Sequence, residues 1–238
     1  VDAAALLREV AMESRASADE HFSGSAWGAL LAADPQALDD TARVRNLFFI
    51  FRLGVGDATA LLDWVLEKLT SNPEWQERVR AEDRAFNAPK GSQPSDVAAR
   101  VVLETLRMEQ SEFLYRRITR PIVVDGFNVP AGWLLRICVS ESHRDPAIFP
   151  EPDRFNPDRF CGRTFGRAEF SPFGADNHGC LGVPLVHFLG RILVEELCHG
   201  FEWRVTRDGP SERGTRHRHH WRPSAERRVA MSPRTPLV

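Results

Sequence analysis

Paired cysteines and membrane-length apolar runs are both missing from this sequence. The four cysteines are Cys138, Cys161, Cys180 and Cys198. They lie far apart without a C-x-x-C pair, which argues against a disulfide framework or a zinc knuckle and favours a reducing compartment. The longest apolar run, residues 47–51, ends at Arg52 and is far too short to cross a bilayer. Since no signal peptide opens the chain, we expect a cytoplasmic location and no membrane segment in this chain.

Lysine is scarce as well, so the positive charge is carried almost entirely by arginine. Lys68 and Lys90 are the only lysines among 31 basic residues, and the net charge of the 238 residues is −2. With 42% hydrophobic and 27% charged residues, the composition is that of an ordinary globular protein. Residues 213–238 are basic but contain one aromatic residue, Trp221, and no nucleic-acid-binding module. We therefore expect a solvated tail or terminal strands there, and no nucleic-acid partner.

The spacing of the apolar residues predicts a mainly helical fold with a minor β-sheet. Helices are predicted over residues 2–15, 40–69, 73–86 and 185–199, with a further helix that Ser95 can cap. Short strands are predicted over residues 122–124, 127–129 and 134–139, and again after the last helix. Residues 143–180 have no clear period, and a long irregular stretch in a compact domain is usually functional.

One cysteine stands among glycines in the stretch SPFGADNHGCLG, residues 171–182. A thiolate is a strong, soft ligand for iron. Cys180 comes just before a predicted helix, whose free N–H groups and dipole stabilise an anionic sulfur. Gly174 and Gly182 let the backbone approach a flat cofactor. The alternative is a buried, inert cysteine.

The same stretch resembles the heme-ligand loop of the cytochrome P-450 family, whose pattern is F-G-x-G-x-H-x-C-x-G. The matching residues are Phe173, Gly174, His178, Cys180 and Gly182. Asp176 stands at the middle glycine of the pattern, a departure that bears on loop shape and redox potential. The resemblance implies that Cys180 ligates the iron of heme b (iron protoporphyrin IX), that Phe173 shields the sulfur from water, and that His178 can reach a carboxylate.

Glu104 and Arg107 stand on one face of a predicted helix, where they can form an ion pair. Such pairs are common on solvated helix faces, which is the alternative interpretation. The pair gains meaning from Arg159 in the segment Pro157–Phe160, because together they resemble the family's E-x-x-R and P-E-R-F motifs. The resemblance implies a buried glutamate shared by two arginines, which braces the irregular stretch before the cysteine. These three residues are expected to be structural rather than catalytic.

The segment from Tyr115 to Pro146 resembles the small-sheet region of the family. It contains the turn V-P-A-G over residues 129–132 and the motif H-R-D-P over residues 143–146. Arg116 falls where the family places an arginine that binds a heme propionate. An ordinary surface arginine is the alternative for Arg116.

Gly54 and Gly56 stand inside the helix predicted over residues 40–69, where each costs about 1 kcal/mol relative to alanine. The family pattern here is A-G-x-D/E-T, and a widened helix leaves a groove over the heme for dioxygen. When the chain is aligned to this pattern without gaps, Gly54 stands at the glycine position, Gly56 at the position of the acid and Asp57 at the position of the alcohol. A one-residue shift makes Asp57 the acid, puts Ala58 on the alcohol and leaves Thr59 next. Asp57 and Thr59 are candidate catalytic residues for proton delivery, with ordinary helix-face residues as the alternative, and Gly54 is a candidate contact of the heme.

The resemblance implies a mainly α fold with a minor β-sheet, namely the C-terminal half of the cytochrome P-450 fold. Its expected parts are a long distal helix, the E-x-x-R helix, a meander, the cysteine heme loop and a proximal helix. Residues 1–212 are expected to form the C-terminal part of a single domain whose N-terminal half is absent. Residues 213–238 are expected to be a basic tail or terminal strands.

The resemblance implies a heme-thiolate monooxygenase that inserts one oxygen atom from dioxygen into a small organic substrate. Electrons would come from a ferredoxin or a flavoprotein reductase, since no flavin or NAD motif is present. Because the preceding half is missing, the isolated fragment is expected to be inactive. Two alternatives stay open: an enzyme that uses peroxide or rearranges its substrate, and a truncated remnant that binds no heme.

Overall fold

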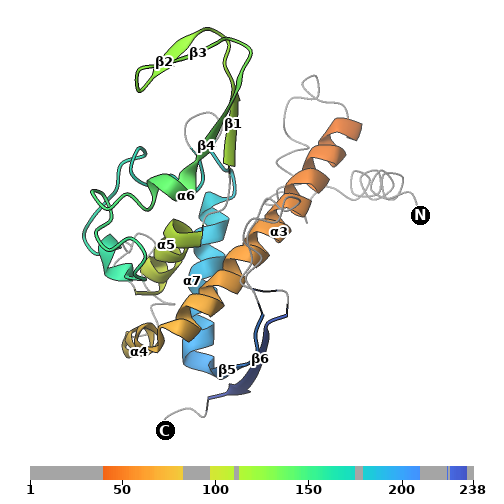
Figure 1. The fold of residues 1–238 in the computed structure, drawn as a ribbon. Helices are drawn as coiled ribbons and strands as arrows, with labels where there is room; N and C mark the ends of the chain where they lie inside the picture. The colour runs from red at the N-terminus through yellow and green to blue at the C-terminus, as the bar shows by residue number, and fades with distance from the viewer. Residues whose placement is uncertain are drawn as a thin grey trace. The chain divides into compact units, whose positions relative to one another are not determined.

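The computed structural model describes residues 40–82, 97–109, 113–174, 179–209, 224 and 226–234 (Figure 1). The helix predicted over residues 2–15 and the cap expected at Ser95 lie outside these residues. The chain divides between Asp57 and Ala58 into two compact units.

The helix α3 (Asp40–Ser71) crosses this division and agrees with the prediction for residues 40–69. In its C-terminal half, Val65 and Leu69 are fully buried because their spacing places them on one face of the helix. The backbone is α-helical through Gly54 and Gly56. The widening that the two glycines led us to expect is therefore not present.

Three further helices surround the buried core of the C-terminal unit: α4 (Pro73–Ala81), α5 (Val97–Glu109) and α7 (Val183–Gly200). Helix α4 begins at Pro73, which suits a first helical position because proline has no N–H to leave unbonded. It ends at Ala81, within the range predicted. The backbone N–H of Val97, the first residue of α5, donates a hydrogen bond of 2.7 Å to the carboxylate of Glu82.

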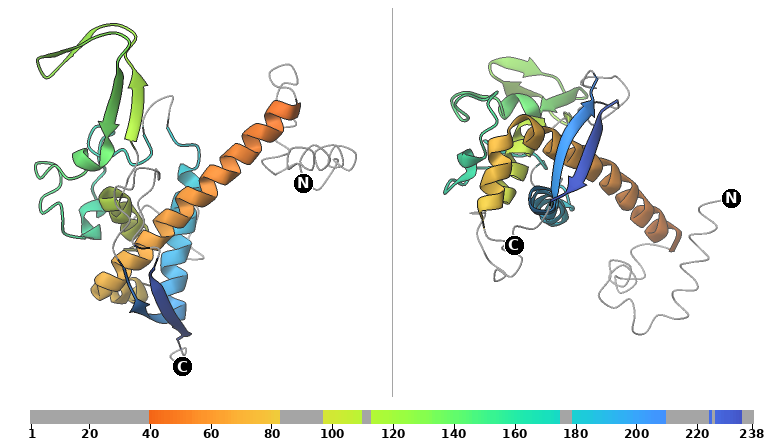
Figure 2. Two further views of the ribbon diagram at one scale, coloured as in Figure 1. Left: turned by 45° about the vertical axis from the view of Figure 1, so that its right-hand side comes forward. Right: turned by 90° about the horizontal axis from the view of Figure 1, so that it is seen from below.

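Helices α5 and α7 pack side by side, as Figures 1 and 2 show. Gly190 of α7 lies against Val102 of α5, and a methyl group at Gly190 would stand 3.0 Å from both Val102 methyls. The small residue thus sets how closely the two helices approach. Fully buried Val101 and Val194 belong to the same hydrophobic cluster as Val65 and Leu69.

In the part of the chain that the structure describes, the strands form three separate antiparallel pairs. Strand β1 (Phe113–Arg117) pairs with β4 (Leu134–Cys138), β2 (Ile122–Val124) with β3 (Phe127–Val129), and β5 (Phe201–Arg207) with β6 (Arg228–Pro233). The β2–β3 hairpin closes through Asp125 and Gly126, which both have positive φ, as a type I′ turn requires. β2 and β3 match their predicted ranges, and β6 is a terminal strand inside residues 213–238.

The predicted irregular stretch contains one short element, and another lies just before it. The one-turn helix α6 (Val139–Ser142) follows β4 directly, and the 3₁₀ turn η2 (Pro157–Phe160) lies against α5. The predicted strand over 134–139 is one residue too long, since Val139 begins α6. In η2 the side chain of Asn156 accepts the N–H of Asp158 at 3.2 Å, which caps the turn.

Candidate functional site

Cys180 presents an exposed thiol immediately before α7. Its sulfur accepts the N–H of Gly182 at 3.3 Å, and Gly182 is the N-cap of the helix. The N–H of Cys180 itself donates to the carbonyl of Phe173 at 2.9 Å, which closes the loop. A free, exposed thiol with a backbone N–H on its sulfur is accessible as a ligand for a soft metal ion.

The loop begins with a backbone conformation that only glycine adopts easily. Gly174 has φ of +73°, in the left-handed region. Phe173, before it, packs against the hydrophobic core and meets the ring of His187 edge-on at 5.4 Å. Burial lowers the pKa of His187, so this ring is neutral near pH 7. Phe173 is thus fixed from both sides. The loop positions of Asp176 and His178 lie outside the described residues.

These residues fit a heme. Within the described part of the chain, no three His, Cys, Asp or Glu side chains gather into a metal site. An exposed thiol just before a helix is the kind of protein ligand that suits an iron whose other ligands come from a porphyrin. Cys198 is a contrasting case. Cys198 is fully buried, and its burial raises its pKa to about 12, so this thiol stays protonated.

The carboxylate of Glu104 is shared by two arginines. Arg107 donates to both oxygens of Glu104, at 2.8 and 2.9 Å, and Arg159 donates to Oε1 at 3.2 Å. The N–H of Asn156 adds a bond of 2.9 Å to the same oxygen. Glu104 and Arg107 are fully buried, so each charge depends on its partners. The geometry is the one the sequence led us to expect, and the structural role of the three residues remains a prediction.

The spare donors of both arginines bind backbone carbonyls of the irregular stretch. Arg107 donates to the carbonyls of His143 at 2.9 Å and Pro152 at 2.7 Å. Arg159 donates to the carbonyl of Glu151 at 2.6 Å and to that of Pro150. A segment without regular hydrogen bonding is therefore ordered by two side chains, which satisfy carbonyls that would otherwise be unpaired.

Asp158, inside the same motif, is tied to α4. It receives two hydrogen bonds from Arg78, at 2.7 and 2.9 Å, and Arg100 of α5 lies 3.6 Å away. The hydrogen bonds from Arg78 lower the pKa of Asp158, and they raise that of Arg78. The contact fixes η2 against two helices. No motif pointed to Arg78, because this residue comes from a helix that is distant in the sequence.

The remaining candidates belong to different elements of the chain. Arg116 lies in β1, opposite Leu135, and its guanidinium donates to the carbonyl of Tyr115 at 2.8 Å. Thr59 is exposed on α3 in the C-terminal unit. Gly54 and Asp57 belong to the N-terminal unit. The roles expected for these residues, in heme contact and proton delivery, stay predictions.

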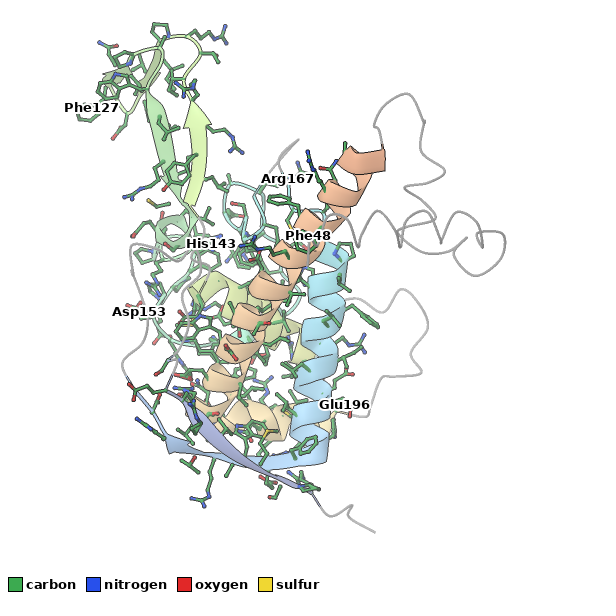
Figure 3. All side chains as sticks on the ribbon, turned by 90° about the vertical axis from the view of Figure 1, so that its right-hand side faces the viewer. Phe48, Phe127, His143, Asp153, Arg167 and Glu196 are labelled. Carbon is green, nitrogen blue, oxygen red and sulfur yellow. The ribbon has the colours of Figure 1, made fainter. Side chains whose placement is uncertain are left out.

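His143 is a residue of this region whose importance the sequence did not reveal. It is fully buried, and its ring nitrogen Nε2 accepts the N–H of Ser171 at 3.0 Å (labelled in Figure 3). The only available signal was its place in the H-R-D-P motif, which does not say that the side chain points to the start of the cysteine loop.

Comparison with known proteins shows the family to which the chain belongs. Residues 6–220 match the sequence model of the family described as Cytochrome P450, so the chain belongs to the cytochrome P450 family. Over 180 residues it is 31% identical to "Putative cytochrome P450 135B1" of Mycobacterium tuberculosis, covering 74% of this chain and 38% of the relative. It is 31% identical over 165 residues to "Abscisic acid 8'-hydroxylase CYP707A1" of Solanum lycopersicum, covering 64% and 34%. The chain thus spans little more than a third of these relatives.

Solved structures share the fold at lower identity. The cytochrome P450DA heme domain superimposes with a TM-score of 0.82 at 21% identity, over 98% of this chain and 53% of that one. Retinoic acid bound cyanobacterial CYP120A1 gives a TM-score of 0.78 at 22% identity, over 97% and 56%. The predicted fold class, mainly α with a minor sheet in the P450 arrangement, is confirmed. No helix among the described residues is long and apolar enough to cross a membrane.

Proposed function

We propose that this chain is the heme-thiolate part of a monooxygenase, in which Cys180 ligates the iron of heme b. The observation that carries the proposal is the exposed thiol at the start of α7, bonded by the N–H of Gly182. The hydroxylase among the relatives supports an oxygen-inserting reaction on a small organic substrate.

A thiolate-bound heme supplies the redox chemistry that activates dioxygen. This chain's own residues hold and tune the sulfur. The N–H of Gly182 offsets part of the negative charge on the sulfur, and the closed backbone ring from Phe173 to Cys180 fixes its direction. Behind the loop, Glu104 and its two arginines keep the preceding stretch in one conformation. Asp57 and Thr59 are proposed to deliver protons.

The partner proposed is an electron-donor protein, a ferredoxin or a flavoprotein reductase. The family implies such a donor, and the sequence shows no flavin or NAD motif of its own. The cytoplasmic location expected from the sequence stays a prediction.

A second candidate is an enzyme that uses peroxide or rearranges its substrate. One observation favours it: neither alignment of residues 54–59 reproduces the family's acid–alcohol pair. Such chemistry needs no proton delivery to bound dioxygen. A heme-free remnant is the third candidate, and the same experiment separates it from both.

The test is the absorption spectrum of the purified protein, reduced and exposed to carbon monoxide. The wild type and Cys161→Ser, which changes another exposed cysteine, should both give the thiolate Soret band. Cys180→Ser should lose it. A thiolate band that survives in Cys180→Ser would refute the ligand assignment, and a wild type that never takes up heme would favour the remnant. Reductase-driven and peroxide-driven oxidation, measured in the full-length protein, then separate the first two candidates.

A further inference from the structure

We propose that His143 is a positioning residue for the cysteine loop: its carbonyl is held by the Glu104 network, and its neutral imidazole holds the backbone of Ser171, where the loop begins. The functional meaning of this link rests on the proposed function, because it assumes that Cys180 holds a cofactor. The link itself rests on hydrogen bonds alone.

The first half of the link is the main chain of His143. Arg107 donates from Nη1 to the His143 carbonyl at 2.9 Å, while its other nitrogens bind Glu104. Because Arg107 is fully buried and held by this carboxylate, the position of the His143 backbone is fixed relative to α5.

The second half is the side chain. Nε2 of His143 accepts the N–H of Ser171 at 3.0 Å. Since the backbone N–H can only donate, Nε2 must be unprotonated, and the ring proton of the neutral imidazole resides on Nδ1. The ring is enclosed by Phe149 and Phe170, with centroids 6.3 and 5.0 Å away. One buried residue thus joins the braced stretch to the segment that leads to Cys180.

The same geometry makes the link depend on the charge of the ring. A proton on Nε2 would face the Ser171 N–H and abolish the hydrogen bond. The charged group that faces the ring is Arg107 of α5, which Glu104 binds from its other side, and its positive charge opposes a second one. Burial is the main cause that lowers the pKa of His143, and a hydrogen bond between the ring and the main chain of Arg107 only partly opposes it. A proton on Nε2 would leave its N–H and the N–H of Ser171 facing each other without an acceptor, and the loop would lose its anchor.

The experiment measures the link in the full-length protein without relying on activity. Nitrogen-15 NMR of the imidazole gives the tautomer, and amide hydrogen exchange gives the protection of Ser171, corrected for the intrinsic pH dependence. Variants His143→Leu and His143→Gln remove and retain an acceptor, respectively. Phe170→Leu changes the ring packing but keeps the acceptor.

The expected tautomer in the wild type carries its proton on Nδ1, and protection of Ser171 should fall as the pH drops through about 4. Exchange of Ser171 in His143→Leu should be at least about fivefold faster, the equivalent of one lost hydrogen bond. His143→Gln and Phe170→Leu should stay within about twofold of wild type. The thiolate Soret band should broaden or weaken in His143→Leu and recover in His143→Gln.

A proton on Nε2, or equal acceleration in all three variants, would overturn the proposal. If His143→Leu fails to fold, the tautomer and the pH dependence of Ser171 protection in the wild type still decide. The proposed function would fail by a different result, a thiolate band that survives in Cys180→Ser. That result would leave the exchange of Ser171 unchanged.

Discussion

At the scale of single residues, the most exacting feature is a carboxylate that has no contact with water. Glu104 is fully buried, and four hydrogen bonds from Arg107, Arg159 and Asn156 replace its hydration. Removing its charge leaves two arginines without a counter-charge, one of them fully buried. Loss of one partner of a buried pair typically costs about 3–5 kcal/mol.

We therefore expect Glu104→Gln to lower the free energy of unfolding by about 3 kcal/mol or more. A matched control is Glu151→Gln, because Glu151 and Arg154 form a pair of the same spacing whose side chains are 69% and 66% exposed. That change should stay within about 1 kcal/mol. Urea denaturation of both variants measures the difference. Equal effects would mean that the Glu104 network is not a structural brace.

The buried ring of His143 makes the free energy of unfolding depend on pH, and the sign of this dependence follows from its lowered pKa. Burial, with the charge of Arg107, lowers its pKa from 6.5 to about 4. Below pH 6.5 the unfolded chain takes up a proton that the folded chain refuses, so stability decreases as the pH falls toward 4 and recovers as it rises. The loss approaches about 3 kcal/mol at pH 4, since one pKa unit corresponds to about 1.4 kcal/mol.

In His143→Gln this contribution disappears, whereas the contributions of the carboxylates remain. The difference in unfolding free energy between wild type and His143→Gln should thus change by about 1–2 kcal/mol between pH 7.5 and pH 5. Denaturation midpoints at several pH values in this range measure it. A difference that is constant with pH would show that the ring is not held neutral.

At the scale of elements, the close packing of α5 against α7 depends on a glycine, Gly190, at the point of contact. A methyl group at Gly190 would meet both methyls of Val102 at 3.0 Å. Valine has little freedom to rotate away in a helix, so the helices must separate. Gly190→Ala should destabilise the protein by about 1–3 kcal/mol.

Two variants test this explanation. Gly200→Ala, at the end of the same helix, meets nothing within 4 Å and should have little effect or stabilise slightly. Adding Val102→Ala to Gly190→Ala should remove the clash and make the two changes non-additive. Thermal unfolding of the wild type, Gly190→Ala, Val102→Ala and the double variant gives the coupling energy between the two positions. If the two changes were simply additive, the loss of stability in Gly190→Ala would not come from the contact with Val102.

Elements with a strong local signal could be predicted, and those ordered by distant residues could not. The apolar period predicted α3, and the Asp125–Gly126 turn predicted β2 and β3. By contrast, η2 depends on Glu104, a residue distant in sequence, which accepts the N–H of Asn156. The candidate site divides in the same way. Cys180 and the Glu104 network were visible in motifs, whereas the bond from Ser171 to His143 is a tertiary contact with no local pattern.

At the scale of the whole molecule, large apolar side chains lie exposed beside the proposed ligand. Leu181 is 87% exposed, and Leu185 and Phe188 are 59% and 61% exposed at the start of α7. Burial of one such side chain is worth about 1.5–3 kcal/mol, so a heme bound here alone would forgo much of the apolar contact that retains it. The chain also spans only 38% of the length of a relative that it matches.

The 238-residue chain, produced alone and loaded with hemin, should therefore hold the group weakly and fail to use it. Transfer of hemin to excess apomyoglobin should be at least about tenfold faster than from the complete P450DA heme domain, the equivalent of one uncovered apolar side chain. An open site also admits water, which removes the dry surroundings that controlled oxygen activation needs. NADPH-driven oxidation with added redox partners should accordingly stay at the level of free hemin. Sustained oxidation tightly coupled to NADPH consumption, together with slow hemin transfer, would contradict this and show that these 238 residues suffice for a closed, working site.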